Sequence, residues 1–162
     1  MTQEDQLSTH DLALLQLGRR LQADGYRFTT PTPLTHQRVN QRDEGQFADS
    51  LRDVFGWSRP FEPGLLSADE QQQLLDAQVI DTYEGHLKSR VRWSSLDDML
   101  FVHSAFPTDA ADSVFFGPDT YRFAQLIHAH LQQNFAPIHR AVDIGCGAGV
   151  GAILADDMGL GK

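Results

Sequence analysis

Residues 141–151 read Ala-Val-Asp-Ile-Gly-Cys-Gly-Ala-Gly-Val-Gly, and this glycine-rich stretch limits the possible folds more than any other part of the chain. A short run of apolar residues and one acid leads into glycines at every second position, and a helix-prone run begins at Val150. This order predicts a strand, a tight turn and a helix. Glycine suits such a turn because its backbone takes positive φ and approaches a ligand closely.

Two kinds of fold place alternate glycines after a strand. The dinucleotide pattern is Gly-x-Gly-x-x-Gly with an acid about 20 residues later. Here Gly145, Gly147 and Gly149 follow Gly-x-Gly-x-Gly, and the acid, Asp143, precedes them. The segment therefore resembles the first motif of class I S-adenosylmethionine-dependent methyltransferases. The resemblance implies that these glycines pass beneath the methionine and ribose of the cofactor and that Asp143 orients its amino group. A structural turn in another Rossmann-like fold is the alternative.

A second stretch supports the same resemblance. Residues 115–123, Phe-Phe-Gly-Pro-Asp-Thr-Tyr-Arg-Phe, are similar to the segment before the first strand in bacterial methyltransferases related to the glutamine and ribosomal-RNA enzymes. In those relatives the region closes over the cofactor, so the resemblance implies that Tyr121 contacts S-adenosylmethionine. From the residues alone, a tyrosine at the start of a helix needs no function, and Asp143 could serve only to fix the glycine turn.

We expect the chain to contain two parts, joined by the polar stretch from Pro107 to Ser113. Residues 1–106 predict an α+β module of helices plus a β-hairpin. Residues 107–162 predict the first strand and helix of a Rossmann-like α/β methyltransferase domain. Because a domain of that family needs further strands, the expectation is the N-terminal part of a methyltransferase, truncated after the first motif and inactive alone.

Apolar spacing and capping residues predict the elements of each part. Helices are expected from Ser8 or Thr9 to Gly25, at about 44–55, at about 68–78 and at about 119–133, and residues 34–42 fit a short helix or a loop. Alternating apolar and polar residues over 86–93, followed by a denser run over 99–103, predict one hairpin.

Charge and composition limit the classes of molecule that the chain is expected to bind. With 13 basic and 22 acidic residues the formal net charge is -9, so broad attraction to a phosphate backbone is not expected. A local patch remains open, because Arg90 and Arg92 beside Trp93 could offer a basic face to RNA or protein. A half-exposed strand explains the same residues. A protein or RNA substrate of the complete enzyme is therefore a possible partner.

Other features bear on compartment and metals. The single cysteine, Cys146, and the polar, acidic first residues fit a cytoplasmic protein. No apolar run approaches the length of a membrane span, which is about 18 residues or more. Seven histidines are present, but His128 and His130 would point to different sides of a helix and no His-Glu-x-x-His pattern occurs. No metal site is expected.

The last ten residues, 153–162, carry a conflicting signal. They resemble the Walker A segment of Swi/Snf-type DNA translocases, although Asp156 stands where the plain pattern has its first glycine. In that family Lys162 would contact phosphate. An ordinary helix terminator and a join between two gene fragments are the competing explanations. A fragment of a Swi/Snf-type ATPase and a non-enzymatic protein- or RNA-binding module therefore stay open beside the methyltransferase.

Overall fold

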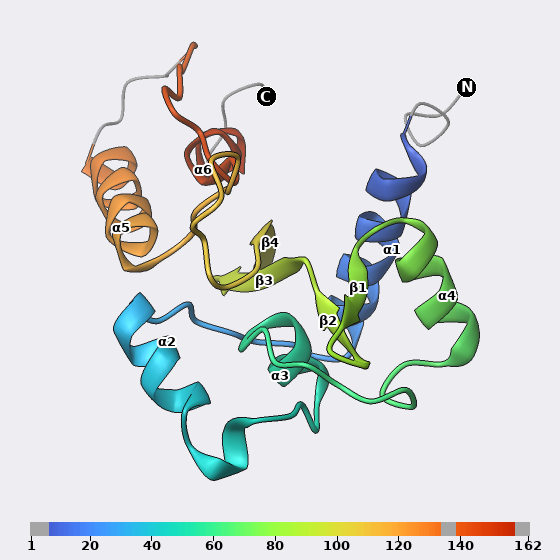
Figure 1. Ribbon diagram of the computed structural model, residues 1–162. Helices are drawn as coiled ribbons and strands as arrows, with labels where there is room; N and C mark the ends of the chain where they lie inside the picture. Colours follow the sequence, from blue (N-terminus) through green and yellow to red (C-terminus); the bar gives the residue numbers. More distant parts are fainter. Residues whose placement is uncertain (1–6, 134–138, 158–162) are drawn as a thin grey trace.

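The computed structural model describes residues 7–133 and 139–157 and shows a mixed α+β protein with two small antiparallel hairpins (Figure 1). The helices are α1 Thr9–Ala23, α2 Pro33–Asn40, α3 Leu51–Phe55, α4 Ala68–Asp76, α5 Pro118–Gln133 and α6 Val150–Asp157, with a 3-10 turn, η2, at Asp43–Gly45. The strands are β1 Ile80–Tyr83, β2 His86–Ser89, β3 Val91–Leu96 and β4 Met99–Ser104.

Two of the predicted helices begin at the capping serines that the sequence shows. Ser8 accepts a hydrogen bond from the amide of Asp11 at 3.1 Å, and Ser67 accepts one from the amide of Glu70 at 3.3 Å. These bonds satisfy amides that have no partner inside the helix. The carboxylate of Glu70 forms an ion pair with Arg20, so this residue joins α4 to α1.

The single helix predicted at about 44–55 is wrong. The chain forms the turn η2, runs irregularly, and starts α3 only at Leu51. The carboxylate of Asp53 explains the break, because it accepts hydrogen bonds from the hydroxyl of Ser50 at 2.7 Å and the amide of Asp49 at 3.3 Å. Such local bonds compete with a continuous helix. Phe47, expected on the buried side of the helix, is 44% exposed.

The region predicted as one hairpin forms two. Strands β3 and β4 form the expected antiparallel pair, with Trp93 opposite Val102 and with 94–96 in the strand, whereas β2 pairs with β1, a strand that sequence reasoning missed. The break between the hairpins falls at Arg90. There the hydroxyl of Ser89 bonds both the amide and the carbonyl of Val91, which turns the backbone locally.

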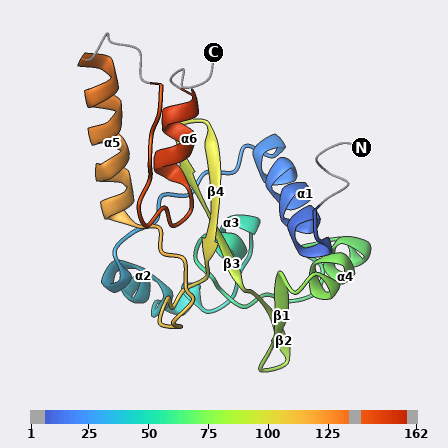
Figure 2. The ribbon, with the colours of Figure 1, turned by 90° about the horizontal axis from the view of Figure 1, so that it is seen from above.

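The β3–β4 hairpin lies between α1 on one side and α5 and α6 on the other (Figure 2). A hydrophobic core forms on each of its two sides. Side chains alternate between the faces of a strand, so Trp93 and Val102 point to one side and Phe101 to the other. The first face packs with α1, α3 and α4. The second face packs with α5 and α6, and its core contains Phe101, Phe116, Ala124, Val150 and Leu154.

The C-terminal region contains both predicted helices, and α6 begins at Val150 as expected. Residues 141–143, predicted as the first strand of a Rossmann-like domain, form no strand and pair with none of the residues that the structure describes. A strand needs a neighbour to satisfy its backbone N–H and C=O groups. Without that strand the Rossmann-like domain stays a prediction. The boundary at 107–113 also stays a prediction.

Replacing Gly18 by Ala tests the contact between α1 and the hairpin. Alanine normally stabilises a helix interior by about 1 kcal/mol relative to glycine. Here the added Cβ would lie 2.7 Å from the ring carbon Cη2 of Trp93. Overpacking costs about 1–3 kcal/mol, so we expect the substitution to lower the free energy of unfolding, measured by urea denaturation.

The matched control is the same substitution in a Trp93→Leu background. Leucine removes the ring that the new methyl group meets, so Gly18→Ala should there be neutral or stabilising. An equal loss of stability in both backgrounds would show that the contact with Trp93 is not the cause.

Candidate functional site

The glycine turn between residue 143 and α6 has the conformation that its sequence predicts. Gly145, Gly147 and Gly149 have φ values of 73°, 53° and 81°. All three lie in the left-handed region that side chains disfavour. The amide of Gly149 closes the turn on the carbonyl of Cys146 at 2.8 Å, and α6 follows directly. The three glycines are thus required by backbone conformation.

The backbone of this turn is open on one side. A Cβ added at Gly145 would have no neighbour within 4 Å, and one added at Gly147 would first meet the carbonyl oxygen of Phe115 at 3.7 Å. The segment that leads into α5 therefore lies beside the glycine turn. The thiol-bearing Cys146 is exposed at the same turn. At Gly145 the main chain therefore has open space where a side chain would stand.

Asp143 points its carboxylate at the first turn of α6. Its Oδ2 lies 2.5 Å from the place that a Cβ on Gly151 would occupy, so glycine at this position leaves room for the acid. A carboxylate is favoured near a helix N-terminus because the backbone amides there carry partial positive charge. The structure thus brings Asp143 together with the glycine turn, as expected for a residue that fixes or shares the site.

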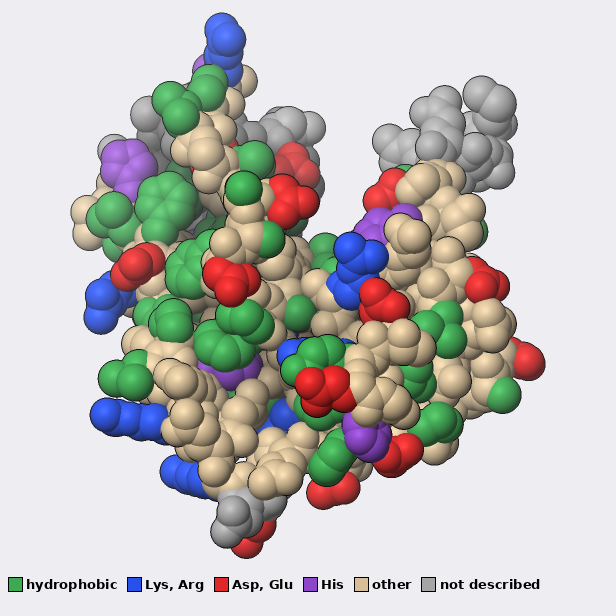
Figure 3. All heavy atoms as spheres, viewed as in Figure 1, with side chains coloured by type: hydrophobic (Ala, Val, Ile, Leu, Met, Phe, Trp, Pro, Cys, Tyr) green, Lys and Arg blue, Asp and Glu red, His purple; other side chains and the backbone are tan. Residues whose placement is uncertain are grey.

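An apolar cavity of about 770 Å³ opens between α5, residues 139–143 and α6. Phe123 and Leu126 line it from α5, and Val142, which is 72% exposed, lines it from the extended segment. Figure 3 shows hydrophobic side chains gathered over α5. Ile144, at the start of the glycine turn, is 93% exposed. Exposed apolar patches of this kind commonly mark binding or packing surfaces.

Tyr121 has a definite partner in the N-terminal part of the chain. Its hydroxyl accepts a hydrogen bond from the amide of Thr30 at 3.1 Å, and its ring meets that of Phe116 edge-on at 5.2 Å. Burial raises the pKa of this tyrosine. The residue therefore ties the start of α5 to the segment that follows α1, and its contact with a cofactor stays a prediction.

Sequence reasoning missed a polar cluster on the second face of the hairpin. The alternation places Arg92, Ser94 and His103 on that face, and all three are buried. The basic and aromatic surface considered for RNA is therefore not formed, because Trp93 and Arg92 are both covered. On the second face Phe116 stacks on His103 with ring centres 5.1 Å apart, whereas Trp93 packs beside Gly18 of α1 on the first face.

The hydrogen bonds of this cluster determine which ring nitrogen of His36 carries the hydrogen. The Nη1 atom of Arg92 lies 3.1 Å from Nδ1 of His36, and a guanidinium can only donate, so Nδ1 accepts. The other ring nitrogen, Nε2, then donates to the carbonyl of Trp57 at 2.9 Å. Burial, together with the charge of Arg92, lowers the pKa of His36 to about 4, and the ring is neutral at pH 7.

A serine and a histidine also meet in this cluster. The hydroxyl of Ser94 lies 2.7 Å from Nε2 of His103 and also contacts the hydroxyl of Thr30. Such a pair resembles a nucleophile and its base. Ser94 is fully buried, however, so a substrate has no access to it. We interpret the pair as part of the packing between the hairpin and its cover.

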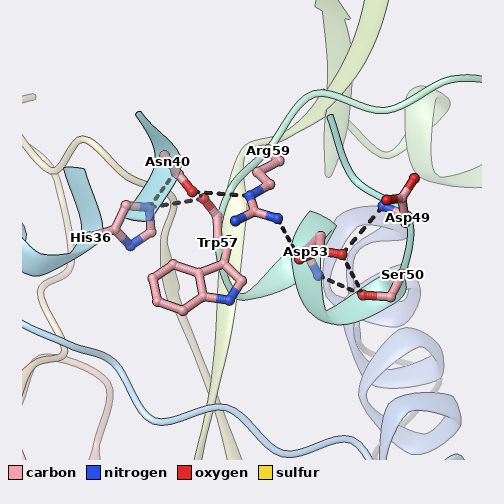
Figure 4. A network of polar contacts seen from close by, with 7 residues as sticks. All are labelled: His36, Asn40, Asp49, Ser50, Asp53, Trp57 and Arg59. Carbon is pink, nitrogen blue, oxygen red and sulfur yellow. Dashed lines mark hydrogen bonds and ion pairs between the residues drawn. The ribbon is translucent and has the colours of Figure 1, made fainter. Parts of the chain in front are cut away.

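The same network continues to α3 (Figure 4). The side-chain amide of Asn40 donates to the carbonyl of Trp57 at 2.8 Å and accepts from Nε of Arg59 at 3.1 Å. Arg59 in turn forms an ion pair of 2.9 Å with Asp53. These partly buried bonds join α2, α3 and the segment that follows α3 into one unit.

Within residues 7–133 and 139–157, no group of three or more histidine, cysteine or acidic side chains is placed to hold a metal ion. No helix in the same ranges is long and apolar enough to cross a membrane. Lys162 and the rest of residues 158–162, half of the segment that resembles Walker A, lie outside the described residues. Comparisons with protein-family models, with curated proteins and with solved structures find no match to the chain.

The lowered pKa of His36 predicts a pH dependence of stability. Between pH 6.5 and about 4 the unfolded chain binds a proton at this ring that the folded chain does not. The unfolding free energy should therefore be highest above pH 6.5 and fall as the pH is lowered, by at most about 1.4 kcal/mol per pH unit for this group.

The variant His36→Gln isolates this contribution. Its amide can accept from Arg92 and donate to Trp57 without titrating, so the unfolding free energy should fall less steeply between pH 6.5 and 4 than in the unchanged protein. Urea denaturation at several pH values measures both slopes. Parallel slopes would mean that His36 does not supply the proton uptake.

Proposed function

We propose that the chain is the N-terminal part of an S-adenosylmethionine-dependent methyltransferase and that the glycine turn is its cofactor-binding loop. The observation that carries the proposal is the turn itself. Its three glycines have positive φ, and a Cβ at Gly145 would project into open space, whereas one at Gly147 would touch only main-chain oxygen atoms, that of Phe115 at 3.7 Å. A loop with those properties can lie directly against a ligand.

The residues around the turn fit the chemistry of this cofactor. S-adenosylmethionine carries an ammonium group, which the carboxylate of Asp143 could accept as a hydrogen-bond donor and counter-ion. Its uncharged ribose suits an open backbone without bulky side chains. Asp143, Gly145, Gly147 and Gly149 would thus hold the cofactor, and Tyr121 would support it by fixing α5.

The cofactor supplies a methyl group on a positively charged sulfur. The contribution expected from this chain is alignment, because holding the two reactants in a reactive geometry removes much of the entropic barrier to transfer. A Rossmann-like sheet would pair with residues 141–143, and helices α5 and α6 would pack beside it. Without a paired strand beneath the turn, the chain alone should bind the cofactor weakly and transfer no methyl group.

Replacing Gly147 by Val tests the proposal. A branched side chain resists positive φ and would fill the open side of the turn, so binding of S-adenosylmethionine, measured by titration calorimetry, should be lost. The matched control is Gly85→Val, since Gly85 also has positive φ but lies in the turn between β1 and β2. That variant should bind as the unchanged protein does.

Titration with ATP tests the alternative that the chain is a fragment of a Swi/Snf-type ATPase. If the segment ending at Lys162 formed a phosphate site, ATP would bind and Lys162→Ala would abolish the binding, whereas Gly147→Val would not. ATP binding that depends on Lys162 would overturn the methyltransferase proposal. Binding of S-adenosylmethionine that survives Gly147→Val would also contradict it.

A further inference from the structure

The second face of the β3–β4 hairpin holds a positive charge without a counter-ion. Arg92 is 3% exposed, and none of the described carboxylates forms an ion pair with it. Burial lowers its pKa to about 10, which still leaves it charged at pH 7. Buried charges in proteins are normally paired, because removing an ion from water without a partner is costly.

Two nitrogen atoms on this face also form no hydrogen bond with the part of the chain that the structure describes. They are Nε of Arg92 and Nδ1 of His103, both buried. The two residues stand directly opposite each other in the antiparallel register, so their side chains leave the same face as neighbours. Nη1 of Arg92 is used by His36, which leaves the Nε edge of the guanidinium free.

The hydroxyls around His103 show what its free nitrogen can do. Thr30 contacts Ser94, and Ser94 contacts Nε2 of His103. If each hydroxyl donates to the next group in this order, Nε2 accepts and Nδ1 carries the hydrogen. Arg92 and His103 then present two N–H donors beside one uncompensated positive charge. A water molecule could satisfy the donors, but only an anion also balances the charge.

We propose that Arg92 and His103 form a binding site for a carboxylate group, which accepts hydrogen bonds from the free Nε edge of the arginine and from Nδ1 of the histidine. A carboxylate suits this edge because its two oxygens match the parallel donors of a guanidinium. Its single negative charge balances that of Arg92. The site does not depend on the glycine turn or on the methyltransferase proposal.

Access to this site involves the start of α5. Phe116 is fully buried against His103, and Tyr121 is half-buried beside it. Both side chains must shift for a carboxylate to reach Arg92. Binding should therefore loosen the contact between the hydroxyl of Tyr121 and the amide of Thr30, which links the hairpin site to the position of α5.

Formate, the smallest carboxylate, is the probe. Chemical denaturation is followed in sodium formate and in sodium chloride at equal ionic strength. Formate at about ten times its dissociation constant should lower the unfolding equilibrium constant about tenfold relative to chloride. In nitrogen-15 spectra the same titration should shift the signals of Arg92 Nε–H and His103 Nδ1. Equal effects of the two salts, with no shift of either signal, would overturn the proposal.

Substitutions of single arginines show where formate exerts its stabilising effect. Arg92→Met should abolish the difference between formate and chloride, whereas Arg27→Met, which removes an exposed guanidinium, should leave it unchanged. If Arg92→Met does not fold, Arg92→Lys keeps the charge but lacks the Nε edge and should reduce the formate effect by most of its size. A formate effect that persists in the Arg92 variant would place the binding elsewhere and refute the site.

Discussion

Burial of both faces of the β3–β4 hairpin is the constraint on which the rest of the structure depends. An antiparallel hairpin commonly leaves one face in water. Here α1 covers the face that carries Trp93, and the start of α5 covers the face that carries Arg92. The hairpin therefore sets the positions of the helices on its two sides, and the main chain of Phe115, just before α5, lies beside the glycine turn.

The buried polar side chains on the second face of the hairpin select the register in which its two strands pair. A slip of one residue in the pairing of a strand would exchange its faces. Arg92 would then meet the apolar side of α1, and Trp93 would lose its place against Gly18. The bonds from Arg92 to His36 and from Ser94 to His103 form only in the observed register. Fully buried polar contacts are therefore costly to form but select one arrangement.

Features with local causes could be predicted from the sequence. The capping serines Ser8 and Ser67 mark helix starts, and the alternate glycines require the turn before α6. The helix over 44–55 was wrong because the bonds that Asp53 makes are not visible in apolar spacing. The alternation places Arg92 and His103 on one face, yet nothing near them in sequence shows that α5 lies over that face.

The hydrogen-bonded residues that hold the start of the chain against the hairpin and α5 are far apart in the sequence. This separation affects folding. The hydroxyl of Tyr26 bonds the carbonyl of Trp93 across 67 residues, and the amide of Thr30 reaches Tyr121 across 91. Contacts of such separation slow folding, because the intervening loop must lose entropy before they form. During synthesis α1 leaves the ribosome well before the hairpin. Its apolar stripe, with Leu17 and Leu21, is then a target for chaperones until Trp93 arrives.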